Sequence, residues 1–223
     1  MLTEPSDQAL ARGLRRLYQL LCEQVPSESW WTGESRFEIV VGAVLTQNTT
    51  WVNVQRALAA LRQGDLLNPQ SIVDMPRGDL ENAIRPCGYY RTKAEYLRSI
   101  GHWFLERDAE ACLLPCDRLR QELLALRGIG PETADDILLY VYHHPVFIYD
   151  AYARRLIAAA GLGDYAHYEA ARRALDPAVN AAQFTVAELA QFHGLIVDSG
   201  KIARRYGGWE QVYSCLLDGT FGQ

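Results

Sequence analysis

The residues best suited to chemistry on a charged ligand lie between Leu126 and Leu138. This segment reads Leu-Arg-Gly-Ile-Gly-Pro-Glu-Thr-Ala-Asp-Asp-Ile-Leu, with helical apolar spacing on both sides of a Gly-Ile-Gly turn. Glycines let backbone N–H groups approach a phosphate, and Pro131 starts a second helix whose N-terminal donors face outward. A plain helix-helix corner is the alternative, because Gly and Pro mark many turns. We predict a phosphate-binding helix-hairpin-helix that uses Gly128, Ile129, Gly130 and Thr133.

A carboxylate follows the hairpin at the start of another helix. Asp150 comes after an apolar stretch, Val146–Tyr149, and before Ala-Tyr-Ala-Arg-Arg-Leu. An Asp in this position is commonly just an N-cap. Capping and catalysis are compatible, because a cap anchors the carboxylate and leaves one oxygen to act on a water or a developing cation. Asp150 is therefore the first candidate catalytic residue.

Three ordered segments carry a family resemblance: the hairpin with its Asp150 loop, Val41–Trp51, and Ile84–Ala94. They resemble the endonuclease III superfamily of DNA glycosylases, with its helix-hairpin-helix and Gly/Pro-Asp loop. The branch they most resemble is the endonuclease III-like 3-methyladenine DNA glycosylases. The resemblance covers roughly residues 25 to 205 and implies a hydrolase of base excision repair that acts on double-stranded DNA containing a damaged base.

The resemblance also implies the fold class, which is all-α and two-lobed. A helical barrel domain that includes the hairpin, residues 34–144, would be inserted between N-terminal and C-terminal helices. Residues 1–33 and 145–223 would form the second domain, which carries the catalytic Asp.

Glu132 departs from the pattern of the strand-cleaving members. In those members a lysine of the second hairpin helix attacks the sugar and forms a Schiff base, which requires an amine. A carboxylate cannot form an imine, so we expect a monofunctional glycosylase that uses water and has no β-lyase activity. Glu132 is the second candidate catalytic residue, either through like-charge repulsion of Asp150 or as an assistant to the water.

Three tryptophans are candidates for the base pocket: Trp30, Trp31 and Trp51. By resemblance to the 3-methyladenine branch they match aromatic residues that sandwich the flipped base. A 3-alkylated purine is cationic, and its stacking on indole gains a cation–π term of about 0.5–2 kcal/mol. Core packing is the alternative, because tryptophans are mostly buried.

Other candidate DNA contacts are Gln47, Asn48 and Lys201. Gln47 resembles the residue that fills the gap left by the flipped nucleotide, and the alternative is an amide bonded to backbone. Lys201 either contacts phosphate or pairs with Asp198, whereas Lys93 is expected to be structural. His193 and Tyr149 are candidates to support Asp150, with core packing the favoured role of His193.

The cysteines argue against a metal cofactor. Many family members hold an iron–sulfur cluster near the C-terminus with four cysteine thiolates. After Ile196 this chain has only Cys215, so no cluster is expected. A zinc site built from Cys112, Cys116, His143 and His144 has weak spacing, and no metal is expected there.

The elements that must position these residues are almost all helical by period. Apolar spacing predicts helices over Val52–Gln63 and Asp117–Arg127, and Thr185 with Glu188 is a capping box. Further helix starts are predicted at Asn68 and Gly130, each followed by Pro. Strand signals are limited to Phe37–Leu45 and Pro145–Tyr149, so no stable sheet is predicted. The helical periods and helix starts together predict about ten to twelve helices.

Composition agrees with a folded protein that acts inside the cell. The 223 residues are 49% hydrophobic and 22% charged, with a net charge of −5 that argues against binding DNA by bulk charge alone. The basic residues include adjacent arginine pairs at 15–16, 154–155, 172–173 and 204–205, so local basic patches can exist. Without a secretory signal or membrane helix, a cytoplasmic, DNA-associated monomer with reduced thiols is expected.

Two other functions stay open. A uracil, mismatched-thymine or oxidised-pyrimidine glycosylase would need hydrogen-bond donors to a poorer leaving group, and Asn48 and Tyr90 keep it open. A noncatalytic DNA-binding protein that reuses the hairpin is the third hypothesis, and the presence of Asp150 argues against it.

Overall fold

The computed structural model describes residues 6–26, 31 and 33–222, and this part of the chain is all-α. It holds twelve α-helices and two short 3₁₀ helices, with no strand among the described residues, which confirms the predicted fold class. The chain divides into two compact units. We call Thr32–His144 the hairpin unit and Met1–Trp31 with Pro145–Gln223 the terminal unit.

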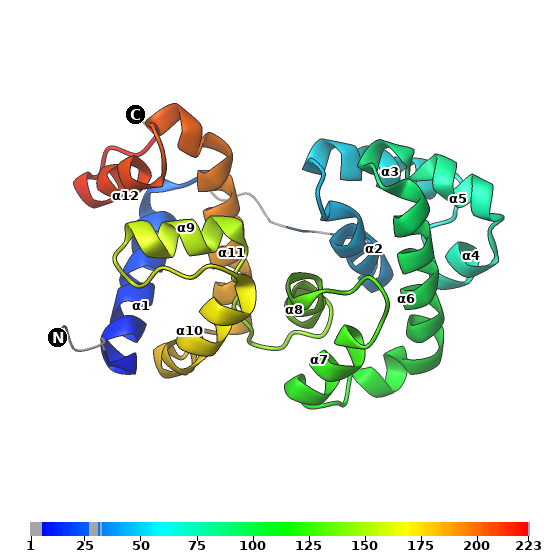
Figure 1. Cartoon of the computed structure of the whole chain (residues 1–223), viewed down its shortest axis with the longest axis horizontal. Coiled ribbons are helices and arrows are strands. Elements are labelled where there is room, and N and C mark those ends of the chain that lie inside the picture. Colours follow the sequence, from blue (N-terminus) through cyan, green and yellow to red (C-terminus); the bar gives the residue numbers. More distant parts are fainter. Residues whose placement is uncertain (1–5, 27–30, 32, 223) are drawn as a thin grey trace. The chain divides into compact units, whose positions relative to one another are not determined.

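The hairpin unit is built from seven α-helices and one 3₁₀ helix within the described residues (Figure 1). They are α2 (Arg36–Thr46), α3 (Trp51–Gln63), α4 (Pro69–Asp74), α5 (Arg77–Ala83), η1 (Arg85–Cys87), α6 (Tyr90–Ala111), α7 (Cys116–Leu124) and α8 (Pro131–Tyr140). The long helix α6 packs against α2, α4 and α5, and α8 packs against α2 and α7. Helix α8 is the second helix of the predicted hairpin.

Helix α2 is the centre of the hairpin unit. It contacts α3, α6 and α8, and nearly all of its residues are buried, including Val40, Val41 and Leu45. A helix covered on all sides is apolar all round and shows no helical period, which explains why Phe37–Leu45 carried a strand signal. The buried Glu38 carboxylate is paired with Arg62 of α3 at 2.5 Å.

The terminal unit holds five α-helices and one 3₁₀ helix in its described part. They are α1 (Asp7–Gln24), α9 (Ala151–Ala159), α10 (Tyr168–Ala182), α11 (Val186–Ile202), η2 (Ala203–Tyr206) and α12 (Trp209–Asp218). Helix α1 packs along α10, and α9 packs against both α11 and α12. Helices from the two ends of the chain therefore share one core.

Aromatic rings fill that core near the start of α9. Phe147 lies 4.8 Å from Tyr149 and 5.2 Å from Phe192 of α11, measured between ring centroids. The Tyr149 hydroxyl donates to Asp176 of α10 at 2.8 Å. Residues 145–149 belong to no helix or strand, and their aromatic side chains pack in the core.

The predicted helix starts are confirmed where capping chemistry is specific. Asn68 caps α4 by accepting from the Ser71 N–H, and Gly130 is the N-cap of α8. Thr185 and Glu188 form both bonds of the capping box at α11. The helix expected from Asp117 begins one residue earlier and ends at Leu124, because 125–130 turn into the hairpin.

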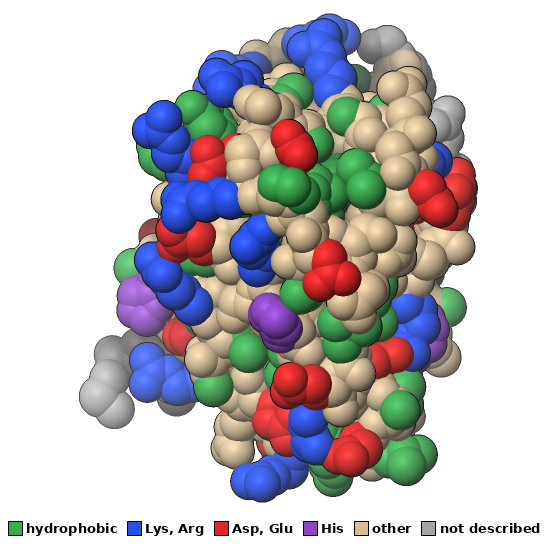
Figure 2. All heavy atoms as spheres, turned by 90° about the vertical axis from the view of Figure 1, so that its right-hand side faces the viewer, with side chains coloured by type: hydrophobic (Ala, Val, Ile, Leu, Met, Phe, Trp, Pro, Cys, Tyr) green, Lys and Arg blue, Asp and Glu red, His purple; other side chains and the backbone are tan. Residues whose placement is uncertain are grey.

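The described helices and surface give two negative observations. None of the described helices is long and apolar enough to cross a membrane. On the face drawn in Figure 2, basic and acidic side chains are interspersed, in keeping with the net charge of −5. On that face, charge alone does not mark a nucleic-acid surface, so specific geometry must be sought instead.

Candidate active site and nucleic-acid interface

The hairpin presents backbone groups at the start of α8. Gly128 has φ +89°, and Gly130, with φ −88° and ψ 176°, leads into Pro131 at the first helical position. Ile129 is buried and anchors the turn in the core. No side chain caps α8, so its first N–H groups are available to an anionic ligand.

The two hairpin glycines have different physical roles. A Cβ on Gly128 would lie 2.1 Å from Cγ of Tyr96, so the fold itself excludes a larger residue there. A Cβ on Gly130 would meet no atom within 4 Å. Because the fold leaves open space at Gly130, its missing side chain keeps the backbone accessible to a ligand.

Gln47 and Thr133 tie α2 to the hairpin. The Gln47 amide donates to the Thr133 hydroxyl at 2.7 Å and to the Gly128 carbonyl at 3.3 Å. Thr133 lies in the first turn of α8 and is buried, and its hydroxyl accepts from Gln47 inside the protein. Asn48 is exposed with φ +53°. Gln47 therefore braces the hairpin in this structure, and its role in filling the DNA stack stays a prediction.

The described tryptophans of the predicted base pocket belong to different units. Trp51 is half-buried at the first position of α3 in the hairpin unit, whereas Trp31 is 8% exposed in the terminal unit. Trp30 lies outside the described residues. The stacked sandwich around a flipped base therefore stays a prediction.

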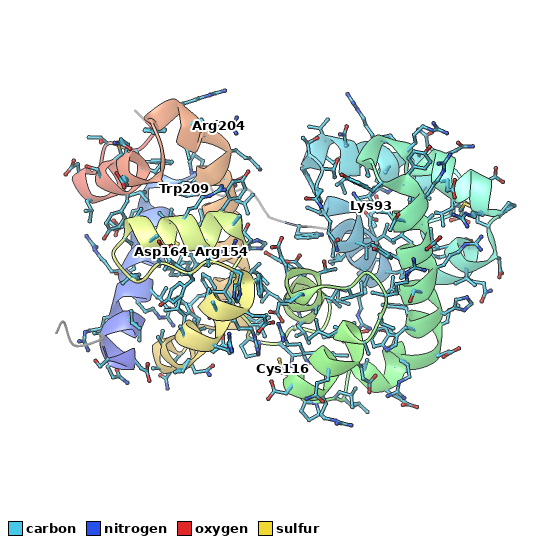
Figure 3. The ribbon with its side chains drawn as sticks, viewed as in Figure 1. Lys93, Cys116, Arg154, Asp164, Arg204 and Trp209 are labelled. Atoms are coloured by element: carbon cyan, nitrogen blue, oxygen red, sulfur yellow. The ribbon has the colours of Figure 1, made fainter. Side chains whose placement is uncertain are left out.

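The two lysines of the chain are both engaged. Lys93 is buried under α2, and its ammonium donates to the carbonyls of Leu45, Gln47 and Cys87 at 2.7–2.9 Å (Figure 3). Burial lowers the pKa of Lys93, and the three carbonyls satisfy all of its donors. This geometry supports the predicted structural role.

Lys201 of α11 is exposed and donates to Asp198 at 2.7 Å, one turn back on the same helix. This is the pairing that the sequence offered as one of two roles for Lys201. Glu132, the second candidate catalytic residue, is exposed in the first turn of α8.

Asp150 is the N-cap of α9 and is almost completely buried. Its Oδ1 accepts the Ala153 N–H at 2.7 Å, which fixes the side chain while Oδ2 points toward α11. Arg154 donates to the Tyr149 carbonyl at 3.1 Å and braces the loop that ends at Asp150. The position thus combines a helix N-terminus, which favours a negative charge, with a held carboxylate.

His193 of α11 is a titratable neighbour of Asp150. Its Nε2 lies 4.0 Å from Oδ2, which is too long for a hydrogen bond. Burial lowers the pKa of His193 to about 3, so the imidazole is neutral near pH 7 and the two groups are not an ion pair. Core packing and proximity to the carboxylate are therefore both present.

One exposed aromatic residue escaped the sequence analysis. Tyr89, the N-cap of α6, has φ +45° and is 74% exposed. A bulky residue in the left-handed region is uncommon, and such strain collects at functional positions. Its neighbour Tyr90 is flanked by Arg85 and Arg91 at 4.8 and 5.6 Å. The sequence signal for this position was a turn residue, Gly88, followed by two aromatic residues. In the structure the first ring is exposed and the second lies beside two arginines.

The model of the HhH-GPD superfamily of base excision DNA repair proteins matches residues 41–180. This range holds the hairpin, Asp150 and most of the helices that position them. The chain belongs to the HhH-GPD superfamily. It is accordingly a DNA glycosylase of base excision repair, and DNA is its binding partner.

Individual HhH-GPD proteins agree with this assignment. A candidate DNA repair glycosylase of Methanocaldococcus jannaschii is 39% identical over 152 residues, covering 66% of this chain and 69% of that protein. Endonuclease III of Sulfolobus acidocaldarius is 27% identical over 178 residues, covering 78% and 77% of the two chains. The solved 3-methyladenine DNA glycosylase of H. pylori, bound to 1,N6-ethenoadenine, has a TM-score of 0.66 and 28% identity, covering 88% and 98%.

Proposed function

We propose that this chain is a monofunctional DNA glycosylase that hydrolyses the N-glycosidic bond of a flipped, alkylated purine in duplex DNA, with 3-methyladenine as the primary substrate. The observation that carries the proposal is Asp150, a buried carboxylate held by the Ala153 N–H at a helix start. It acts as a monomer.

The chemistry asks little of the departing base. Alkylation at N3 makes the purine cationic, so the C1′–N bond breaks with its electron pair on the base, which leaves neutral. The sugar becomes oxocarbenium-like, and the Asp150 carboxylate stabilises that positive charge. A water oxygen then bonds to C1′, and its proton passes to the Asp150 carboxylate and on to solvent.

The engagement of both lysine side chains supports hydrolysis without β-lyase chemistry. Schiff-base formation requires an accessible, unprotonated amine at the sugar. Lys93 is enclosed by three carbonyls, Lys201 is paired with Asp198, and Glu132 occupies the hairpin position. Glu132 is exposed in the first turn of α8, where it would assist the water rather than the leaving group.

The relative from H. pylori supports the choice of an alkylated purine, because its name gives 3-methyladenine and the present chain covers 98% of it. Trp51, half-buried at the start of α3, supplies an aromatic surface of the kind that a cationic base favours. Tyr89 is assigned a stacking contact with DNA, since an exposed aromatic ring suits a base face, and the neighbouring Tyr90 carries the contacts with Arg85 and Arg91.

We further propose that the enzyme works without an iron–sulfur cluster. Such clusters need four thiolates, whereas the cysteines of the terminal unit are only Cys22 and Cys215. Among the described residues no three His, Cys, Asp or Glu side chains gather as a metal site. The donor set does not fit the cluster, and the chemistry above uses no metal. Iron analysis and the visible spectrum of purified protein would contradict this by showing a stoichiometric cluster.

The substrate is tested by release of free base from methylated duplex DNA, resolved by chromatography. The protein should liberate 3-methyladenine, and Asp150→Asn protein should not. If uracil or mismatched thymine is released instead, the alkylated-purine assignment is wrong and the pyrimidine alternative replaces it. If no base of any kind is released while duplex DNA is bound, the enzyme assignment itself is wrong.

The mechanism is tested by borohydride trapping on the same DNA. Wild-type protein should give no covalent adduct, and the abasic strand should stay intact until alkali is added. An adduct that persists in Lys93→Met, Lys201→Met protein with a blocked N-terminal amine has no amine source and would be an artefact. An adduct lost in one of these variants would show lyase chemistry and overturn the monofunctional assignment.

A further inference from the structure

The terminal unit contains a groove of about 780 Å³ that the proposed active site does not use. Its walls come from one face of α9, from the loop before α10, and from the turn into α12. The groove begins at Ala151, the residue after Asp150, and continues along α9 to Ala159. At 1.5 Å per residue, that face runs for about 12 Å away from the reacting carboxylate.

One of the arginine pairs found in the sequence lines this groove, and a second pair precedes one of its walls in the chain. Arg154 and Arg155 line it directly. Arg204 and Arg205 belong to η2, which leads within two residues into the lining residues Gly207 and Gly208. Figure 3 shows Arg154, Arg204 and Trp209 in this unit, coming from α9, η2 and α12.

The arginines in and beside the groove include three with exposed side chains that pair with no other described side chain: Arg155 in the lining, and Arg204 and Arg205 in η2. Arg154 and Arg155 balance the two carboxylates of the lining, so any excess of positive charge comes from Arg204 and Arg205 beside it. Exposed arginines next to a hollow suit a polyanion. The guanidinium fork suits bidentate contact with phosphate.

The rest of the lining fits a sugar-phosphate strand. Trp209 packs on Tyr152 at 5.8 Å between ring centroids and supplies an apolar surface. Gly207 and Gly208, with φ +91° and +126°, keep the turn free of side chains, and no side chain caps the first turn of α12. Asp164 and Glu210 also line the groove and would oppose a phosphate.

We propose that this groove binds backbone phosphates of the DNA strand beside the damaged nucleotide. The inference rests on the proposed function only for the place of the DNA, because Asp150 must contact the reacting sugar. Groove and carboxylate share α9, so the arginines contact phosphates within a few nucleotides of that sugar. The contact is sequence-independent and positions the strand.

The test is the salt dependence of affinity for undamaged duplex DNA, which does not require base excision. Each phosphate contact contributes about 0.9 to the slope of log Kd against log salt. The variant Arg155→Gln, Arg204→Gln, Arg205→Gln should lower that slope by about 2 to 3 and weaken binding at least tenfold at low salt. The matched control is Arg12→Gln, Arg16→Gln, Arg173→Gln, which removes three exposed charges from α1 and α10 of the same unit.

A further variant, with two substitutions, should change DNA affinity in the opposite direction. Asp164→Asn with Glu210→Gln removes the two carboxylates of the groove and should tighten DNA binding several-fold. An equal slope in wild type and in the arginine variant would overturn the proposal. So would an equal loss in the control, because bulk charge and not the groove would then be responsible. Base release by the control variant Arg12→Gln, Arg16→Gln, Arg173→Gln should stay unchanged. Because DNA affinity is measured on undamaged duplex, loss of the groove contact is distinguishable from failure of the proposed function.

Discussion

Asp150 and the Gly128–Gly130 hairpin are positioned by opposite means. Asp150 is buried, accepts a hydrogen bond from the Ala153 N–H and lies next to His193. The fold therefore determines where its carboxylate lies. The hairpin offers backbone groups with open space at Gly130 and no capping side chain. A group that reacts needs a fixed side chain, whereas a group that holds a polyanion needs an unobstructed backbone. Catalysis and DNA affinity should therefore be separable by mutation.

The largest effect is expected from Asp150→Asn. Removing the negative charge should slow base release about 10³-fold, the size seen when one electrostatic stabiliser of a transition state is lost. Asn caps a helix as well as Asp does, so the free energy of unfolding should change by less than about 0.5 kcal/mol. Single-turnover base release and urea denaturation measure the two quantities. Activity within tenfold of wild type would remove Asp150 from the mechanism.

The next largest effect is a difference in stability between alanine variants of the two hairpin glycines. Gly128→Ala should destabilise the protein by about 2–4 kcal/mol, because an L residue is strained at φ +89° and its Cβ overlaps Tyr96. Gly130→Ala should leave the unfolding free energy within about 1 kcal/mol of wild type.

Gly130→Ala should instead weaken DNA binding about tenfold, since a methyl group would stand where a phosphate approaches. Fluorescence anisotropy with duplex DNA and thermal melting distinguish the two variants. Normal DNA affinity in Gly130→Ala protein would show that this backbone is not a DNA contact.

The buried His193 beside Asp150 should make the stability of the fold depend on pH. The unfolded chain protonates His193 below about pH 6.5, whereas the folded chain resists until about pH 3. The folded state therefore loses stability as pH falls through this window, by about 2 kcal/mol between pH 7 and pH 5. His193→Asn should lack that loss. Denaturation curves at both pH values test this, and the same pH dependence in wild type and variant would contradict the neutral, buried imidazole.

The smallest effect concerns the brace behind the hairpin. Gln47→Ala removes two hydrogen bonds to Thr133 and Gly128 and should cost about 1 kcal/mol of stability. Gln63 of α3 is exposed and outside this network, so Gln63→Ala is the matched control. If Gln47→Ala weakens DNA binding with no loss of stability, Gln47 contacts DNA and is not chiefly a brace.

Local rules predicted most of the fold but not its central helix. Capping residues are read over three or four positions, so Asn68, Gly130 and Thr185 marked the helix starts correctly. The β-branched run in α2 gave a strand signal instead of a helical period, because other helices cover α2 on every side. Such burial depends on α3 and also on α6 and α8, which are distant in the chain.

The candidate site was predictable to the same degree. Asp150 and the hairpin carry their chemistry in local sequence, and the structure supplies the contacts that fix them. The Gln47–Thr133 bond joins residues 86 apart, and the proximity of His193 to Asp150 arises from packing of α11 on α9. Tyr89 was missed because its backbone conformation, and not its residue type, sets it apart.

Single-turnover base release from methylated duplex DNA, measured with rising enzyme concentration, tests the separation of roles most directly. Gly130→Ala protein should need more enzyme but reach the wild-type rate at saturation. Asp150→Asn protein should bind at wild-type concentrations and stay about 10³-fold slower at every one of them. A Gly130→Ala rate that stays low at saturation, or an Asp150→Asn rate that recovers, would contradict the assignment of binding to the hairpin and catalysis to the carboxylate.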